Sequence, residues 1–362
     1  MLYMLTVPTL ILDVEKCKSN IAAMAENARR NNVLFRPHFK THQSHEIGRW
    51  FREVGVTCIT VSSLEMANHF AKDKWGDITV AFPVNILEID KINTLASSIS
   101  LNLLVESQKT IGQLSKTLTS PIGVFIKIDI GYHRTGVNPE STELISQILD
   151  EIDNSKLIKF RGFLGHAGHS YSARGIDEIS AIHTGSIQII TGVKEHFTDR
   201  HPELIVSVGD TPTCSTMQDF GSVDEIRPGN FVFYDLSQVA IGSCTQEQIS
   251  VAVACPVVSI HKDRSEIIIY GGGVHFSKER LEHPVYGGIY GQVVEGRSAG
   301  WGNIIAGVYV SKLSQEHGTI SAPSAYIEAI QVGDLVKILP VHSCMTANLL
   351  KKYVTTEGEL LK

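Results

Sequence analysis

The residues from 36 to 42, which read RPHFKTH, place one lysine among several cationic side chains. A lysine amine can form a Schiff base with an aldehyde cofactor once desolvation or a neighbouring cation lowers its pKa. Arg36, His38 and His42 are close enough in sequence to Lys40 to supply that cation. A lone lysine is more often a solvated loop residue. The segment therefore predicts cofactor chemistry only together with other features of the chain.

A second group suited to chemistry is the pair His342 and Cys344, which follows the apolar run Leu335–Val341. If that run continues as a strand, residues two apart face the same side, and one imidazole and one thiolate would converge on one ion. Zinc accepts both ligand types, and two protein ligands leave coordination positions open, as a catalytic metal requires. A buried cysteine beside a surface histidine is the competing interpretation.

Short β-rich segments alternate with amphipathic segments through the first two thirds of the chain. The strand candidates are Val33–Arg36, Cys58–Val61, Ile78–Ala81, Leu101–Val105, Gly123–Asp129, Phe160–Leu164, Ile205–Val208 and Glu225–Arg227. The helix candidates are Leu64–Lys72, Ile86–Ser98, Ser107–Leu118, Ser141–Ile152 and Ile176–Phe197. Eight strands separated by helices predict an α/β fold built on a (β/α)₈ TIM-type barrel. A doubly wound sheet is the alternative, but no GxGxxG turn follows the first strand.

Beyond residue 240 the helical periodicity fades, and residues 249–261, 265–270, 304–313 and 334–339 read as strands between glycine-rich turns. We therefore expect a barrel over residues 12–240. A mostly β domain is expected over residues 241–362, joined by an N-terminal strand at 2–11. The stretch from His283 to Trp301 is predicted to be a long loop over this β domain.

Barrel enzymes carry their chemistry at the C-terminal ends of the strands, which is where Lys40 lies, just after the first strand candidate. The loops after strands seven and eight of such barrels commonly bind phosphate through backbone N–H groups. The candidates in these loops are Ser207, Gly209, Thr211, Gly229 and Asn230. Ordinary βα turns use the same residue types, so this prediction depends on Lys40.

The composition of the 362 residues is that of a globular chain, with 43% hydrophobic and 19% charged residues. The formal net charge of −6 gives no electrostatic support to nucleic-acid binding. The six cysteines are scattered without a CxxC pair, which favours reduced thiols in a cytoplasmic protein. No apolar run approaches the roughly 18 residues of a membrane span.

Several ordered motifs make the chain recognisable. They are RPHFKTH, PTLILD at 8–13, KIDIGYHRTGV at 127–137, HAGHSY at 166–171, SVGDTPT at 207–213, EIRPGNFVFYD at 225–235 and VGDLVKILPVHSCMTANL at 332–349. Together they resemble the D-serine dehydratase and D-threonine aldolase family. These are fold-type III, alanine-racemase-like enzymes that use pyridoxal phosphate. The resemblance implies that Lys40 binds the cofactor.

The resemblance also implies roles for residues around the cofactor. Arg227 matches the arginine placed against the pyridine nitrogen, where it would keep that nitrogen neutral because it cannot accept a proton. Arg134 matches a position near the phenolic oxygen of the cofactor. His166 or His169 is a candidate for stacking on the pyridine ring, and Tyr171 is a candidate substrate contact.

His342 and Cys344 match the metal pair of D-serine dehydratases, whereas D-threonine aldolases are similar but have His and Asp there. Since a thiolate favours zinc over manganese, Cys344 places the chain nearest to the dehydratase branch. We therefore expect β-elimination from a β-hydroxy D-amino acid such as D-serine, giving a 2-oxo acid and ammonia. Zinc would assist the hydroxyl group, and Lys40 would remove the α-proton. The family also implies a homodimer with the active site near the interface.

Other activities remain open at this point. An aldolase would use the same lysine and metal but break the Cα–Cβ bond. A racemase needs a base on each face of the substrate, for which Tyr286 or Tyr290 could serve, but then the metal pair is unexplained. A non-enzymatic pyridoxal phosphate carrier lacks a second domain, and a barrel without a cofactor leaves the motifs unexplained. The run Gly271–Gly273 with His275 departs from the family pattern and leaves the substrate undetermined.

Overall fold

The computed structural model describes residues 5–297 and 299–361. The chain divides into two compact units. The first, called the barrel unit, comprises Ala22–Lys40 and Gly48–Gly229. The second, called the β unit, comprises Met1–Ile21, Thr41–Ile47 and Asn230–Lys362. Each unit has its own sheet and is described separately.

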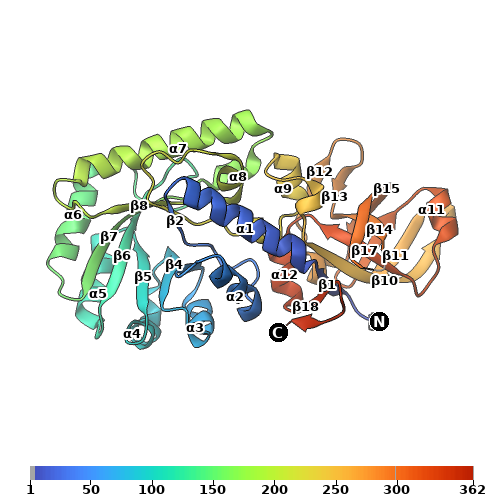
Figure 1. Ribbon diagram of the computed structural model, residues 1–362, viewed down its shortest axis with the longest axis horizontal. Helices are drawn as coiled ribbons and strands as arrows, with labels where there is room; N and C mark the ends of the chain where they lie inside the picture. Colours follow the sequence, from blue (N-terminus) through green and yellow to red (C-terminus); the bar gives the residue numbers. More distant parts are fainter. Residues whose placement is uncertain (1–4, 298, 362) are drawn as a thin grey trace. The chain divides into compact units, whose positions relative to one another are not determined.

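The barrel unit is built on an eight-stranded parallel sheet in the order β2-β9-β8-β7-β6-β5-β4-β3. Its strands are β2 (Leu34–Phe35), β3 (Ile59–Val61), β4 (Asp77–Pro83), β5 (Ser100–Val105), β6 (Ile122–Lys127), β7 (Ile158–Leu164), β8 (Ile205–Val208) and β9 (Glu225–Ile226). The predicted order of eight parallel strands is thus confirmed. The sheet curls, as Figure 1 shows, with helices along its outer side.

Helices precede or connect the strands of the barrel unit. They are α1 (Val14–Arg30), α2 (His45–Glu53), α3 (Leu64–Lys72), η1 (Ile86–Glu88), α4 (Ile89–Ala96), α5 (Gln108–Thr117), α6 (Thr142–Asp153), η2 (Gly168–Ser172), α7 (Ile176–Phe197) and α8 (Thr211–Thr216), with α1 and α2 crossing the unit boundary. Side-chain caps define where several begin: Ser63 accepts a hydrogen bond from the Met66 amide, and Ser107 accepts one from the Thr110 amide.

Apolar side chains from neighbouring strands fill the inside of the sheet. Leu104, Phe125 and Leu164 are each 1% exposed and form one cluster. The sheet closes incompletely, because β2 and β3 share no ladder among the described residues. A single parallel bridge between His38 and Thr60 joins the chain just after β2 to β3. The segment that bears Lys40 therefore lies at the seam of the curled sheet.

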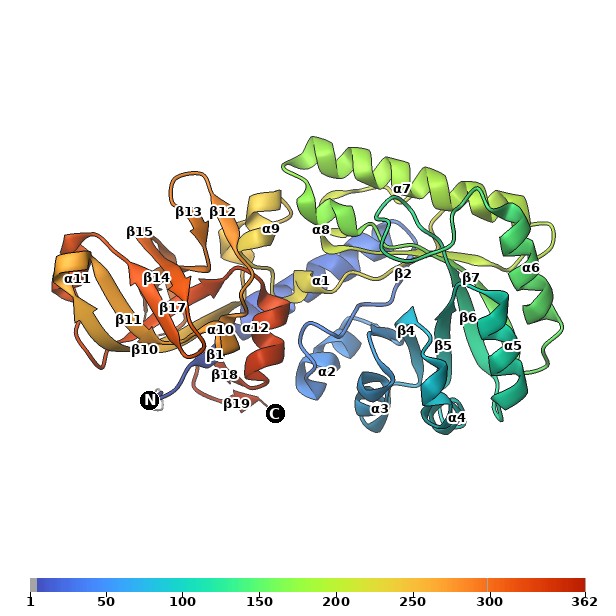
Figure 2. The ribbon, with the colours of Figure 1, turned by 180° about the vertical axis from the view of Figure 1, so that it is seen from behind.

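The β unit contains a nine-stranded sheet in the order β11-β16-β15-β14-β17-β10-β1-β18-β19 and a small hairpin of β12 and β13. Its strands are β1 (Thr9–Leu12), β10 (Val251–His261), β11 (Glu266–Tyr270), β12 (Leu281–His283), β13 (Gly287–Ile289), β14 (Gly291–Gly296), β15 (Trp301–Leu313), β16 (His317–Ser321), β17 (Leu335–Pro340), β18 (Tyr353–Thr355) and β19 (Leu360–Leu361). Its helices are η3 (Asn230–Val232), α9 (Leu236–Ile241), η4 (Gln246–Gln248), η5 (Lys262–Arg264), α10 (Gly273–Phe276), α11 (Ser324–Ala329) and α12 (Ser343–Leu350). Figure 2 shows these strands from behind.

The sequence interpretation was wrong for the stretch from His283 to Trp301. It is not a long loop: β12 and β13 form a hairpin, and β14 pairs with β15 and β17. The strands are short and rich in glycine, which hid their period from the sequence. No helix among the described residues is both long enough and apolar enough to cross a membrane.

Candidate active site and metal pair

Lys40 lies at the end of a segment that its neighbours hold rigidly. The amide of His38 donates to the Pro228 carbonyl at 2.8 Å, and the amide of Phe39 donates to the Thr60 carbonyl at 2.8 Å. The Phe39 ring is fully buried among Phe51, Phe70 and Trp75, with ring centroids 4.9–5.1 Å away. Lys40 itself is exposed. The buried residue before it therefore anchors an exposed amine at the C-terminal end of β2.

His166 lies just after β7, near several cationic side chains. Its Nδ1 donates to the carbonyl of Gly209 at 2.6 Å, because a carbonyl can only accept. Burial, together with the charges of Arg227, Lys40 and Arg134, lowers the pKa of His166 to about 3, although the hydrogen bond to Gly209 acts to raise it. The imidazole is therefore neutral, with a lone pair on Nε2. Arg227, Lys40 and Arg134 therefore lie close enough to His166 to affect its pKa. All four are predicted cofactor residues.

Arg227 follows β9 and is 4% exposed. Its Nε donates to the Ser207 hydroxyl at 2.6 Å, and its Nη2 donates to the carbonyls of Gly165 at 2.5 Å and Ser207 at 3.3 Å. Within the described residues, no protein acceptor takes a hydrogen from Nη1. Burial lowers the pKa of Arg227 to about 10, and Glu225 opposes this effect. The guanidinium is fixed on one side and has donors left on the other.

Ser207 and Gly209 have structural reasons for their identities that differ from the predicted phosphate role. The Ser207 side chain is fully buried, and its hydroxyl lies between Arg227 and Glu225. A Cβ atom at Gly209 would lie 2.7 Å from the backbone of Arg227. Because the Ser207 hydroxyl already donates to Glu225 and accepts from Arg227, it cannot also donate to a phosphate. Glycine at 209 permits the close approach of the Arg227 backbone.

The N-terminus of α8 is occupied by protein groups. Asp210 caps the helix by accepting from the amide of Thr213 at 2.8 Å, and it also accepts from the Ser170 hydroxyl at 2.8 Å. The amide of Thr211 donates to the Tyr171 hydroxyl at 3.2 Å. Tyr171 is 37% exposed, so its ring faces solvent while its hydroxyl supports the loop. A phosphate role for Thr211 and Gly229 stays a prediction.

The loop that carries Arg134 is closed by hydrogen bonds to Asp129, which accepts from the amides of Gly131 at 3.1 Å and His133 at 3.0 Å. The Arg134 guanidinium lies 5.0 Å from the centroid of the Tyr132 ring. That ring stacks on His169 at 6.4 Å and meets His166 edge-on at 5.8 Å. The Tyr132 ring therefore joins Arg134 to both histidines.

The metal pair lies in the β unit, but not on a strand as the sequence suggested. His342 is the N-cap residue of α12, and Cys344 is in its first turn. His342 Nδ1 hydrogen-bonds Glu279. Burial alone would lower the pKa of His342, but hydrogen bonds to Cys344 and Glu279 outweigh it and raise the pKa to about 11. The imidazole thus contacts the thiol even though the strand geometry is absent.

Cys344 is held by polar neighbours within the β unit. Its Sγ lies 3.2 Å from Thr41 Oγ1 and 3.3 Å from Asn230 Nδ2. Asn230 also donates to Asp235 at 2.7 Å, and its Oδ1 is buried without a partner among the described residues. Asn230, a predicted phosphate ligand, therefore directs its side chain to Cys344. No group of three or more His, Cys, Asp or Glu residues in the described ranges could hold a metal.

Sequence reasoning missed two buried charged residues in the barrel unit and one acidic residue in the β unit. Lys127 ends β6 and donates to the Ile128 carbonyl at 2.9 Å; burial and Arg227 lower its pKa to about 8. Glu225 is fully buried two residues before Arg227. The i and i+2 spacing on a strand was a usable signal for Glu225. Glu279 is 63 residues from His342, so no local pattern reveals it.

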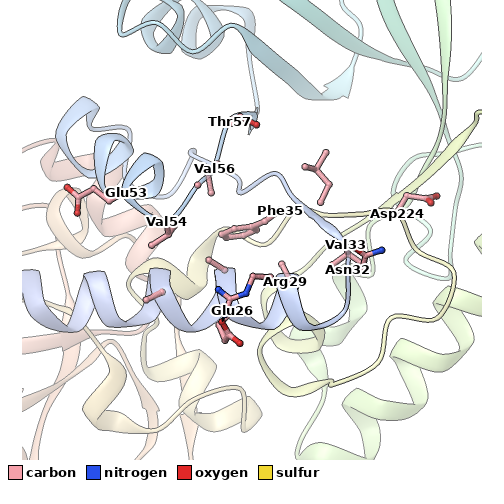
Figure 3. A pocket seen from close by; sticks show the side chains of 15 residues that line it. Glu26, Arg29, Asn32, Val33, Phe35, Glu53, Val54, Val56, Thr57 and Asp224 are labelled. Atoms are coloured by element: carbon pink, nitrogen blue, oxygen red, sulfur yellow. Dashed lines mark hydrogen bonds and ion pairs between the residues drawn. The ribbon is translucent and has the colours of Figure 1, made fainter.

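One cavity of the barrel unit lies elsewhere. It measures about 890 Å³ and is lined by the end of α1, by Leu34 and Phe35, and by the loop before β3 (Figure 3). Its charged side chains have partners: Arg29 pairs with Glu26, and Asp224 pairs with Lys194. It lies at the N-terminal ends of the strands, opposite the end that bears Lys40. We therefore do not place the chemistry there.

The chain is similar to known proteins along almost its whole length. The family described as "Alanine racemase, N-terminal domain" matches residues 12–237, and "Putative serine dehydratase domain" matches residues 250–356. The D-serine dehydratase of Dictyostelium discoideum is 29% identical, over 95% of this chain and 91% of that protein. The D-threo-3-hydroxyaspartate dehydratase of Delftia sp. (strain HT23) is 28% identical, over 96% and 93%. The solved structure of the Delftia sp. HT23 enzyme superimposes with a TM-score of 0.89 at 25% identity, covering 99% of this chain and 98% of that one. The chain therefore belongs to the alanine-racemase-like, fold-type III family of pyridoxal phosphate enzymes.

Proposed function

We propose that the protein is a pyridoxal-phosphate- and zinc-dependent D-serine dehydratase that eliminates water from a β-hydroxy D-amino acid to give a 2-oxo acid and ammonia. The observation that carries this proposal is the His342–Cys344 pair backed by Glu279. Dehydratases are also the relatives named at 28–29% identity over at least 95% of this chain.

The residues of the barrel unit fit pyridoxal phosphate. The donors of Arg227 Nη1, which have no protein acceptor among the described residues, suit a neutral ring nitrogen. The neutral His166 suits a place beside the ring. When bound, the cofactor supplies a conjugated system that withdraws electrons from the substrate Cα. Arg227 would donate a hydrogen bond and keep the ring nitrogen unprotonated, since an arginine cannot accept a proton.

The other barrel residues bind and move protons. Lys40 Nζ would hold the cofactor at rest and would take the α-proton of the substrate during the reaction. The lone pair on His166 Nε2 stays available, because the Gly209 carbonyl holds the hydrogen on Nδ1. Arg134 would contribute positive charge to the cofactor site, and Tyr171 is proposed as a contact for the substrate.

The β unit fits a divalent ion with soft ligands. His342 Nδ1 is engaged by Glu279, and the ring also contacts Cys344, so an ion would bind Nε2 in place of the contact with the thiol, in the arrangement usual for metal-binding histidines. Cys344 supplies sulfur, which favours zinc. When bound, zinc supplies a Lewis acid that makes a hydroxyl a better leaving group. Thr41 and Asn230 hold the Cys344 sulfur in place.

A second candidate is cleavage of the D-threonine aldolase type, which would use the same lysine and a metal on the substrate hydroxyl. An Arthrobacter sp D-threonine aldolase is 22% identical to this chain, over 94% of it. Racemisation has less support, because the Tyr286 hydroxyl accepts from the Gly307 amide at 2.9 Å and the ring is stacked on His283 and Tyr309. A tyrosine so engaged is poorly placed to act as a base.

The test is product analysis on a panel of D-serine, D-threonine and D-threo-3-hydroxyaspartate. A dehydratase releases a 2-oxo acid and ammonia in equal amounts, whereas an aldolase releases glycine and an aldehyde. Treatment with a chelator should abolish the release, and zinc should restore it better than manganese. Full D-serine deamination after complete metal removal would refute the zinc requirement. Sedimentation of the same sample tests the homodimer that we also propose.

A further inference from the structure

A chain of buried polar groups crosses the inside of the barrel unit and ends at Arg227. Asp77, at the start of β4, accepts from Arg36 Nη1 at 2.8 Å and from Nη2 at 3.2 Å. Arg36 Nε donates to Glu225 Oε2 at 2.5 Å, and Glu225 Oε1 accepts from the Ser207 hydroxyl at 2.6 Å. The same hydroxyl accepts from Arg227 Nε at 2.6 Å. Every bond in the series is between side chains.

Only one assignment of donors and acceptors is consistent with this series of hydrogen bonds. An arginine Nε–H can only donate, so the Ser207 oxygen must accept from Arg227. Both oxygens of an ionised Glu225 can only accept, so the single hydroxyl hydrogen of Ser207 must point at Glu225. The carboxylate therefore fixes the rotation of the hydroxyl. Its lone pair is then aimed at Arg227.

Burial strengthens the hydrogen bonds of this series. Ser207 and Glu225 are 0% exposed, Arg36 is 1% exposed and Arg227 is 4% exposed. Two guanidinium groups and two carboxylates form a neutral set, with Glu225 between the two arginines. Charge-assisted bonds in such a place are short and costly to break. Asp77, with a side chain 35% exposed, is the end of the series that reaches solvent.

We propose that Ser207 and Glu225 are positioning residues that aim the free Nη1 edge of Arg227 at the ring nitrogen of the bound cofactor. This inference rests on the proposed function, since it requires pyridoxal phosphate in the barrel unit. Bonds at Nε and Nη2 leave the guanidinium only one edge to present. Without the hydroxyl, Arg227 keeps the two carbonyl contacts at Nη2 and can pivot about them.

The test separates positioning from simple structural support by removing the ring nitrogen from the ligand. The apoprotein is titrated with pyridoxal phosphate and with its 1-deaza analogue, in which a CH group replaces that nitrogen, and visible absorption reports binding. Variants are Ser207→Ala and Glu225→Gln. The amide of Glu225→Gln preserves shape but sets an NH₂ group against either Arg36 Nε or the Ser207 hydroxyl. The matched control is Ser186→Ala, a buried serine of the same unit that donates to the Ile130 carbonyl.

We expect Ser207→Ala and Glu225→Gln each to weaken binding of pyridoxal phosphate by about ten-fold or more, and binding of the deaza analogue by less than about two-fold. Ser186→Ala should affect neither ligand. Equal losses for the two ligands would mean a structural role and overturn the proposal, as would no loss for either. Should Ser207→Ala fail to fold, the shape-preserving Glu225→Gln decides alone.

The outcomes also separate this inference from the proposed function. A wild-type protein that binds pyridoxal phosphate but does not deaminate D-serine refutes the dehydratase and leaves the positioning proposal to the titrations. A wild-type protein that binds neither ligand refutes both.

Discussion

His166 donates its Nδ1 hydrogen to the carbonyl of Gly209 at 2.6 Å, which ties the loop after β7 to the loop after β8. The bond selects one tautomer of a half-buried imidazole whose pKa is also lowered by three neighbouring cations. The protein therefore holds a histidine neutral at a position where a proton would be costly. This has a consequence for stability at acidic pH.

His166→Gln should make the free energy of unfolding depend less on pH between pH 7 and pH 5. Because burial lowers the folded pKa to about 3 while the unfolded value is about 6.5, the unfolded chain takes up the proton first as pH falls. Stability due to His166 is therefore full above about pH 6.5 and is lost toward pH 3, by at most about 1.4 kcal/mol per pH unit. Urea unfolding at pH 7 and pH 5 measures it. The exposed His196→Gln is the control; if both variants match the wild type, the imidazole is not held neutral.

Lys40→Ala should abolish covalent attachment of the cofactor. Borohydride treatment of the wild-type protein should fix pyridoxal phosphate on the peptide containing Lys40, as mass spectrometry would show, and the variant should carry none. Lys116→Ala, which removes an exposed lysine of the same unit, should label like the wild type. Labelling of another lysine in the wild type would refute the assignment.

Phe39→Ala should destabilise the protein by about 3–5 kcal/mol, because it removes a fully buried ring from contact with three aromatic neighbours. It should also lower the yield of the Lys40 adduct, since Phe39 anchors the adjacent residue. Denaturant unfolding and borohydride labelling measure the two effects. Phe82→Ala, at a ring that is 60% exposed, should change stability by less than about 0.5 kcal/mol. Equal losses at the two positions would contradict the anchoring role.

Cys344→Asp should shift the metal preference from zinc toward manganese, because a carboxylate is a harder ligand than a thiolate. Metal content after dialysis against equal zinc and manganese measures the change directly, without an activity assay. Cys244→Ser, at a cysteine of the same unit outside the pair, should retain the wild-type preference. An unchanged preference in Cys344→Asp would show that the sulfur is not a ligand.

Glu279→Gln should weaken zinc binding by about 10–100-fold, because the carboxylate that orients His342 and strengthens its basicity is lost. Competition with a chromogenic chelator gives the affinity. Glu282→Gln, an exposed carboxylate on β12, should bind zinc like the wild type. If Glu279→Gln binds equally well, its bond to His342 does not serve a metal.

Much of the barrel unit could be predicted, because its strands are apolar runs bounded by clear turns. Ile205–Val208 and Ile176–Phe197 have the predicted bounds. The orientation of Ser207 could not be read in the same way, because the hydroxyl turns inward to a carboxylate on the neighbouring strand. Loop composition alone suggests a phosphate ligand there, whereas the pairing of Ser207 with Glu225 in register gives it internal partners.

For the metal pair, the sequence predicted the residues but not the elements that hold them. The residues His342 and Cys344 were predicted, but the strand that was to align them ends at Pro340. Asp235 accepts from the Ser343 amide at 2.9 Å and supports the start of α12, 108 residues away in sequence. Glu279 lies 63 residues from His342. Local periodicity contains no information about such long-range bonds, so the supporting residues required the structure.

The position of β1 gives the chain an order of assembly. Its partners are Val251–Ala254 on one side and Tyr353–Thr355 on the other. A ribosome completes the barrel unit at Gly229 before it has made either neighbour of β1, so this strand emerges well before both of its partners. Three of its four residues are buried in the finished sheet, so during synthesis it is an apolar segment without a partner. A chain that stops before Tyr353 would keep this strand as a bare sheet edge, and such truncated products should self-associate.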